Sequence, residues 1–132
     1  MKGGEKVNFE NVFERFKSYA DLSENDAQKW EYLVYDSIGE VRCMLLPGCD
    51  VEGNCHRLIT AAAALAFYRY HCICAARRGA DSFKAGDVTV NIADKGVEHA
   101  HRMYREAMQN ISDIVGVDDF VFGRIDSICT ES

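Results

Sequence analysis

The sequence predicts a mainly α fold: a compact domain of four helices, with a long β-prone loop between helices 3 and 4 and an extended C-terminal arm. Apolar residues recur every three to four positions through four segments, and capping or helix-breaking residues separate these segments. The chain contains one proline and no internal repeat. At 132 residues and 48% hydrophobic content, one domain over residues 1–132 can bury its own core. We expect a helical body over about 8–116, the loop at 79–94 and the arm at 117–132.

The first two predicted helices have clear apolar faces. Residues 9–20, "FENVFERFKSYA", place Phe9, Val12, Phe13, Phe16 and Tyr19 on one side. Ser23 is a predicted N-cap, with Glu24 and Asp26 in the first turn of a second helix that continues through "AQKWEYLVYDSIGEVRCML". Its buried stripe comprises Trp30, Leu33, Val34, Ile38, Val41 and Leu45. Pro47 and Gly48 end it.

The third predicted helix runs from near Asn54 to Arg78 and is apolar almost all round, which places it at the centre of the domain. Its run "AAAALA" lets neighbouring backbones approach closely, and Gly79 is a predicted C-cap. The helix is long enough to cross a membrane, but alanine dominates it and Arg69 and His71 lie inside. We therefore interpret it as the core helix of a protein that has no membrane partner.

The fourth helix is predicted over Lys95–Val115, with Asp94 as a cap and Gly116 as its end. The preceding loop, within "RRGADSFKAGDVTVNIADKG", is too long for an ordinary connection between helices. Its segment "GDVTVNI" alternates like a strand, with Val88, Val90 and Ile92 on one side. An isolated strand pair is marginal in water, so these residues need a partner. The partner is either "FVFGRI" of the C-terminal arm or an edge on another subunit.

Composition and charge exclude several classes of function. The formal net charge of −6 argues against non-specific binding to nucleic acid, which needs a basic face, and against binding to anionic lipid. The N-terminus lacks an apolar signal-peptide core, so secretion is not expected.

No pattern of catalytic residues is evident, and we predict that the protein is not an enzyme. There is no "GxSxG" elbow and no phosphate-binding loop, and His99 and His101 fall on different faces of a helix. A pocket lined by these histidines or by cysteines with strongly shifted pKa values would favour an enzyme instead.

Six cysteines raise the possibility of a metal site: Cys43, Cys49, Cys55, Cys72, Cys74 and Cys129. A metal-binding or regulatory module would use Cys43, Cys49, Cys55 and the adjacent His56. Structural zinc sites usually bring ligands in pairs two to four residues apart, whereas these gaps are five residues long. We favour reduced thiols packed as small hydrophobic groups and expect no cofactor.

Taken in order, three stretches resemble the small head–tail connector (adaptor) proteins of long-tailed bacteriophages and related prophage proteins. They are "ITAAAALAFYRYHCICAARRG", "SFKAGDVTVN" and the helix from Lys95 to Val115, and the resemblance covers roughly residues 22–115. In that family an alanine-rich central helix with an aromatic–Arg cluster leads into a glycine-bounded loop and a further helix. The high cysteine content departs from the family.

The resemblance implies a structural protein that forms a ring beneath the portal protein, extends the DNA channel and receives tail or head-completion proteins. Its location would be the virion, or the bacterial cytoplasm during assembly, and it would not recognise a nucleic-acid sequence. The candidate contacts between subunits lie in the loop and the arm: Phe83, Lys84, Val88, Val90, Ile92, Phe120 and Phe122. In the alternative, the loop folds back on its own domain and buries Phe83 and Val90.

Overall fold

The computed structural model describes residues 7–84 and 95–116, and within these it gives no side-chain environment for residues 80–84. Five helices pack compactly: α1 (Phe9–Ala20), α2 (Glu24–Gln28), α3 (Glu31–Met44), α4 (Cys55–Lys84) and α5 (Lys95–Asn110). The described ranges contain no strand, only a single antiparallel bridge between Leu45 and Val115. The predicted mainly α class is confirmed.

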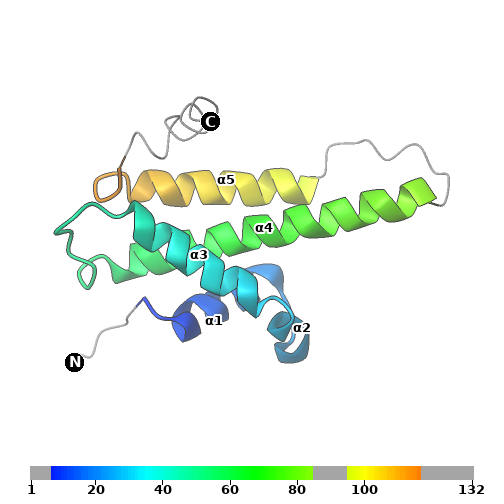
Figure 1. The fold of residues 1–132 in the computed structure, drawn as a ribbon, viewed down its shortest axis with the longest axis horizontal. Helices are drawn as coiled ribbons and strands as arrows, with labels where there is room; N and C mark the ends of the chain where they lie inside the picture. Colours follow the sequence, from blue (N-terminus) through cyan, green and yellow to red (C-terminus); the bar gives the residue numbers. More distant parts are fainter. Residues whose placement is uncertain (1–6, 85–94, 117–132) are drawn as a thin grey trace.

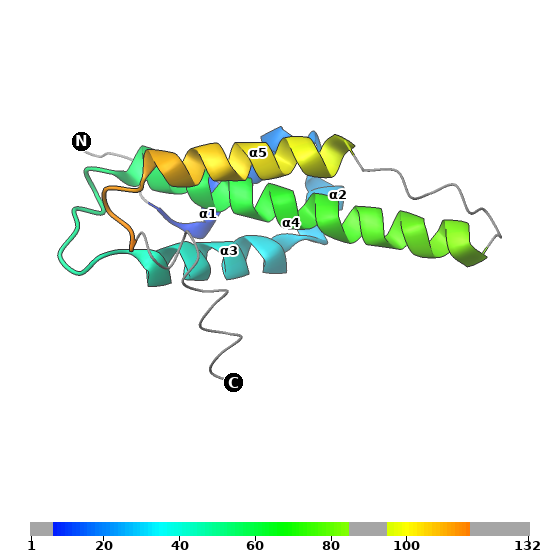
Figure 2. The same ribbon diagram turned by 90° about the horizontal axis from the view of Figure 1, so that it is seen from above.

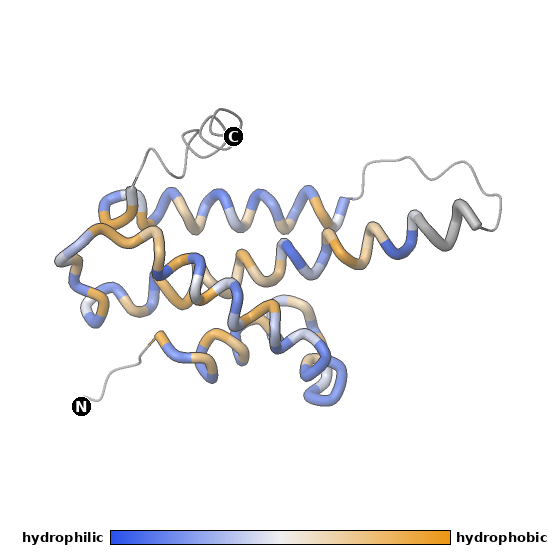
Figure 3. The backbone as a smooth tube through the Cα atoms, viewed as in Figure 1, coloured by the Kyte–Doolittle hydropathy of each residue, from blue (hydrophilic) through white to orange (hydrophobic). Residues whose placement is uncertain are grey.

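The central element is α4, as its all-round apolar sequence predicts. It contacts α1, α3 and α5, and α5 runs back along it in the antiparallel direction (Figures 1 and 2). Every residue from Ala61 to Ala66 is buried. Small side chains at these positions allow the other helices to approach its backbone. Figure 3 shows apolar residues concentrated where α1, α3 and α4 lie together, and a regular alternation along α5.

The first helix has the predicted bounds, and its ends explain why. The Asn8 side chain accepts a hydrogen bond from the Asn11 backbone N–H, which caps the N-terminus. At the C-terminus, Asp21 adopts a left-handed conformation with φ 56°, and its N–H donates to the carbonyls of Lys17 and Ser18. Val12, Phe13 and Phe16 are buried, in agreement with the predicted apolar face.

The single second helix predicted from the sequence is wrong, because the structure divides it into α2 and α3. Ser23 does cap α2, since its hydroxyl accepts from the Asp26 N–H. The helix then breaks at Lys29–Trp30, where Trp30 leaves the helical conformation with ψ 14°. The break buries the Trp30 indole, whose ring stacks edge-on against Tyr70 of α4 at 5.0 Å. Burial of this aromatic ring overrides local helix propensity.

The predicted end of the third helix at Arg78 is also wrong. Gly79 is not a C-cap, because α4 continues through it to Lys84. A C-cap glycine normally has a positive φ, and Gly48 is the one glycine in the described ranges that does. A glycine inside a helix costs only about 1 kcal/mol relative to alanine, and no proline follows it. The predicted start of the loop at residue 79 is therefore wrong, and the rest of the predicted loop, 85–94, lies outside the described residues.

The fourth predicted helix ends earlier than expected. The α5 helix stops at Asn110, and residues 111–114 form a turn that leads to the bridge at Val115. The Arg57 guanidinium accounts for this end, because it donates to the exposed carbonyl oxygen of Asn110. Hydrogen bonds from Leu46 N to Ile114 O (2.9 Å) and from Gly116 N to Met44 O (3.1 Å) then fix the following segment beside the end of α3.

Candidate functional site

The far end of α4 projects beyond the helices that cover it (Figures 1 and 2). Residues 61–67 are buried and 68–75 are half-buried, whereas Ala76, Arg77 and Arg78 are exposed. From Arg77 to Lys84 the helix extends by about 10 Å at 1.5 Å per residue. The chain thus leaves the helical body at Lys84 on a continuous helix and returns at Lys95.

A contact with Trp30 stabilises α4 at the point where the helix leaves the helical body. The Arg77 guanidinium lies over the Trp30 ring, 5.4 Å from the ring centroid, and Trp30 also stacks on Tyr32 at 6.4 Å. A cation held over an indole face is attracted by the ring quadrupole. The break between α2 and α3 therefore supplies the aromatic ring that supports α4 near its exposed end.

The structure places two of the seven predicted contact residues within this end. The backbone of Phe83 and Lys84 is helical and belongs to α4, so their predicted position in a loop is wrong. The other five residues, Val88, Val90, Ile92, Phe120 and Phe122, lie outside the described residues.

On the half-buried part of α4, each of the two phenols, Tyr68 and Tyr70, is followed one helical turn later by a thiol. Burial raises the pKa of Tyr68, and a hydrogen bond with the Cys72 side chain raises it further. Burial also raises the pKa of Tyr70, which interacts with Cys74 one turn away. Both phenols are therefore neutral at physiological pH, and neither provides a phenolate nucleophile. Their role is packing: Tyr68 stacks on Tyr104 of α5 with centroids 6.0 Å apart and the planes at 5°.

An ion pair links α3 to α4 beside this aromatic stack. The Arg69 guanidinium donates to the Glu40 carboxylate, and both side chains are partly exposed. Burial raises the pKa of Tyr104, the negative charge of Glu40 raises it further, and Arg69 opposes this effect. The predicted aromatic–Arg cluster of the core helix thus lies at a junction of three helices, where it joins them.

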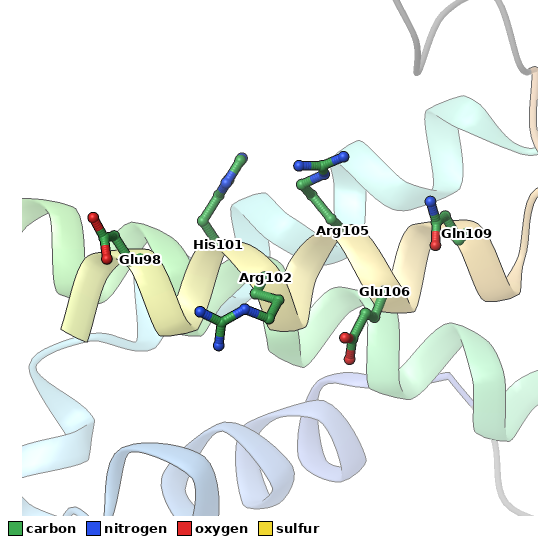
Figure 4. Close-up of a pocket in the computed structure, with 6 residues that line it drawn as sticks. All are labelled: Glu98, His101, Arg102, Arg105, Glu106 and Gln109. Carbon is green, nitrogen blue, oxygen red and sulfur yellow. The ribbon is translucent and has the colours of Figure 1, made fainter. Parts of the chain in front are cut away.

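The outer face of α5 carries a shallow polar groove lined by Glu98, His101, Arg102, Arg105, Glu106 and Gln109 (Figure 4). All six side chains come from one helix. Two glutamates and two arginines line it, so the groove has no charge of a single sign to attract phosphate or a carboxylate. We infer that this face is a solvated helix surface.

The four residues of the metal-binding alternative do not form a site. Cys43, Cys49, Cys55 and His56 all belong to the described ranges, and no group of three or more His, Cys, Asp or Glu residues there could hold a metal ion. Cys43 is exposed on α3, whereas Cys55 is buried at the start of α4. All five cysteines described by the structure are free thiols.

A further exposed surface escaped the prediction. The side of α3 opposite the core carries Tyr32, Tyr35, Gly39 and Cys43, and we call these four residues the outer line of α3. Tyr32 and Tyr35 are 50% and 58% exposed. The helical spacing of these residues, at i, i+3, i+7 and i+11, was available in the sequence. The buried stripe on the opposite side of α3 gives the stronger sequence signal.

By length and composition alone, Cys55–Gly79 could cross a membrane. Half of its most apolar window is buried inside the structure, as expected for the core helix of a helical domain. Comparison of the chain with protein-family models, with curated proteins and with solved structures found no match in any of the three.

Proposed function

We propose that this protein is a structural adaptor of the head–tail junction of a long-tailed phage or prophage. Its copies form a ring that binds the portal protein, extends the DNA channel and offers a platform to tail or head-completion proteins. The protein acts by assembly and carries no catalytic role in this proposal.

The observation that carries the proposal is the projecting end of α4. The part of α4 that extends beyond the helical body adds nothing to the buried core of an isolated domain, because Ala76, Arg77 and Arg78 are exposed there. A stiff helix that extends to Lys84 beyond the helical body suits a subunit that must reach a neighbour. The contact between Arg77 and Trp30 holds the direction of this helix.

The resemblance of the sequence supports the same function. The stretch "ITAAAALAFYRYHCICAARRG" lies within α4 and runs from its buried part, through its half-buried part, to the exposed residues 76–78, and the helix that follows in the resemblance is α5. These two helices pack together in the antiparallel direction, so the connecting segment leaves and returns at one end of the molecule (Figure 1).

A closed ring requires two different patches on each subunit, one of which meets the other on the next copy. We assign the first patch to the end of α4 and the segment after it, with Phe83, Lys84, Val88, Val90 and Ile92 as its contact residues. Phe120 and Phe122 of the C-terminal arm are assigned to contacts with an adjoining component. The net charge of −6 suits a channel that must let DNA pass without holding it.

The proposal is tested by mixing the full chain with the portal protein encoded in the same genome and weighing the products by native mass spectrometry. The expected product is a complex that carries many copies of the chain on one portal ring. Absence of any complex at concentrations of about 100 µM, well above a micromolar dissociation constant, would contradict it. A capsid protein from the same genome serves as the control partner.

A further inference from the structure

A head-to-tail contact between copies needs a second patch on each subunit, different from the end of α4. The outer line of α3 is a surface of this kind. Tyr32 and Tyr35 are the two exposed aromatic residues in the described ranges, and both lie on this line. A Cβ atom added at Gly39 would meet nothing within 4 Å, so no described segment of the chain covers this part of α3.

Both tyrosines are already held in place by rings of their own chain. Tyr35 stacks on Phe9 of α1, with the ring centroids 4.3 Å apart and the planes at 17°. Tyr32 stacks on Trp30. Each tyrosine nevertheless keeps half or more of its surface exposed. A ring that is fixed in the free subunit loses little conformational freedom when another surface binds to it, so these tyrosines suit an interface.

Charge is distributed unevenly between this side of the molecule and α4. Residues 9–44, which include α1, α2 and α3, contain eight acidic and four basic residues, whereas α4 contains five basic residues and one acidic residue. Asp36, beside the outer line, is exposed and forms no ion pair within the described ranges. Arg77 and Arg78 are exposed at the other surface, the end of α4. Surfaces of opposite sign orient two molecules as they associate.

From these features we propose that the outer line of α3 receives the end of α4 of a second copy of this chain. Tyr32 and Tyr35 form the apolar centre of the contact, and Asp36 attracts the basic end of the incoming helix. Gly39 allows that helix to approach the backbone of α3 closely. The inference rests on the adaptor function, because it names the surface that completes the contact between neighbouring copies of the ring.

The exposed thiol of Cys43 lies on the outer line and allows a direct test by cross-linking. Ala76→Cys adds a thiol on the exposed part of α4. Within one chain a short cross-linker does not join the two positions. Glu40 pairs with Arg69, and the two helices run in opposite directions from this pair, so the thiols lie about 15 Å apart along them (Figure 1).

The full-length variant, alone and with the portal protein of the same genome, is treated with bis(maleimido)ethane. A ladder of dimers, trimers and larger species is expected, because every copy carries both patches. Peptide mass spectrometry should show links from Cys43 to the introduced thiol. Gln109→Cys is the matched control, since Gln109 is exposed on α5 and should give no such ladder.

A change of charge tests the attraction between the two patches. Asp36→Lys in the Ala76→Cys protein should lower the yield of the ladder about tenfold at low salt. Glu106→Lys makes the same change of charge on the outer face of α5 and should leave the yield unchanged. Both residues are exposed, and circular dichroism checks that helical content is constant.

Equal yields in these two charge variants would overturn the proposal. Links only between two Cys43 thiols would also overturn it, because two α3 helices would then meet symmetrically. A complex with the portal protein that forms without the expected link would overturn this contact and leave the adaptor function in place. A ladder from a chain that does not bind the portal protein would support the contact and contradict the adaptor function.

Discussion

Arg57 in the first turn of α4 holds the carboxylate of Asp113 with two nitrogens, at 3.0 Å from Nη1 to Oδ1 and 3.2 Å from Nη2 to Oδ2. The same guanidinium donates to the carbonyl of Asn110 and to the side chain of Asn54. One residue thus joins the start of the core helix to the end of α5. A fork of donors suits this task, since lysine would offer only a point charge.

This pair makes stability depend on pH at the acid end. The Arg57 hydrogen bonds hold the pKa of Asp113 below its ordinary value of 3.8. The stabilising contribution is therefore complete above pH 3.8 and is lost as the pH falls through the lower pKa of the folded state. Thermal unfolding of Asp113→Asn should occur at a lower temperature than that of the unmodified protein near neutral pH. The difference between the two unfolding temperatures should shrink as the pH falls below 3.8. A difference that stays constant as the pH falls below this value would show that the charge on Asp113 has no part in it.

Ser37 is fully buried on α3, and its hydroxyl has no hydrogen-bond partner. Desolvating a hydroxyl without a partner is unfavourable, whereas a methyl group suits the same site. We expect Ser37→Ala to raise the free energy of unfolding by about 1 kcal/mol in urea denaturation. Ser23→Ala, which removes the cap of α2, should instead lower it by about 1 kcal/mol. A loss of stability in Ser37→Ala would mean that the hydroxyl has a partner.

Ala63 on α4 is fully buried, in agreement with the close packing that its alanine run predicts. Ala63→Leu should destabilise the fold by about 1–3 kcal/mol, because the added atoms have no room. Ala76→Leu on the same helix is the control, since Ala76 is exposed and should tolerate the change. Chemical denaturation of the two variants side by side separates packing from helix propensity. Equal stability of the two variants would disprove crowding at Ala63.

Alanine substitution of Gly79 tests where α4 ends, and the same substitution of Gly48, which has a positive φ, is the comparison. Gly79 lies inside the helix, and a methyl group added to it would meet nothing within 4 Å, so Gly79→Ala should stabilise the protein by about 0.5–1 kcal/mol. Gly48 has a φ of 82°, so Gly48→Ala should destabilise it by a similar amount, about 1 kcal/mol. Urea denaturation measures both. If Gly79→Ala is the destabilising change, Gly79 is a C-cap after all and the helix stops there.

Much of the helical pattern could be predicted from the sequence because it depends on local signals. The bounds of α1 follow from the apolar spacing of residues 9–20 and the polar residues after them, and the burial of α4 follows from its composition. The break at Trp30 could not be predicted, because it depends on the Tyr70 ring 40 residues away. The end of α5 likewise depends on Arg57 of another helix.

The candidate site shows the same division between local and long-range information. The sequence indicated that residues near Phe83 leave the core, but it placed them in a loop because Gly79 resembles a C-cap. Whether the helix continues past a glycine depends on small energy differences that a local pattern does not resolve. The outer line of α3 could have been found by plotting the side of the helix opposite its buried stripe.

The end of α4 should control self-association. Phe83→Asp places a charge on this projecting end and should shift sedimentation of the protein, alone or with its portal partner, toward smaller species while helical content stays constant. Ser82→Asp makes the same change of charge one residue earlier, about 100° around the helix, and should have a weaker effect. If Phe83→Asp unfolds the protein, Phe83 belongs to the core and is not a contact between subunits.

The measurement that tests the central claim most directly is a reconstruction, by electron cryomicroscopy, of this chain bound to its portal protein. A closed ring of about a dozen copies is expected, in which the end of α4 and the segment after it contact the next copy. Density that shows no ring, or a ring in which the end of α4 touches only solvent, would contradict the claim.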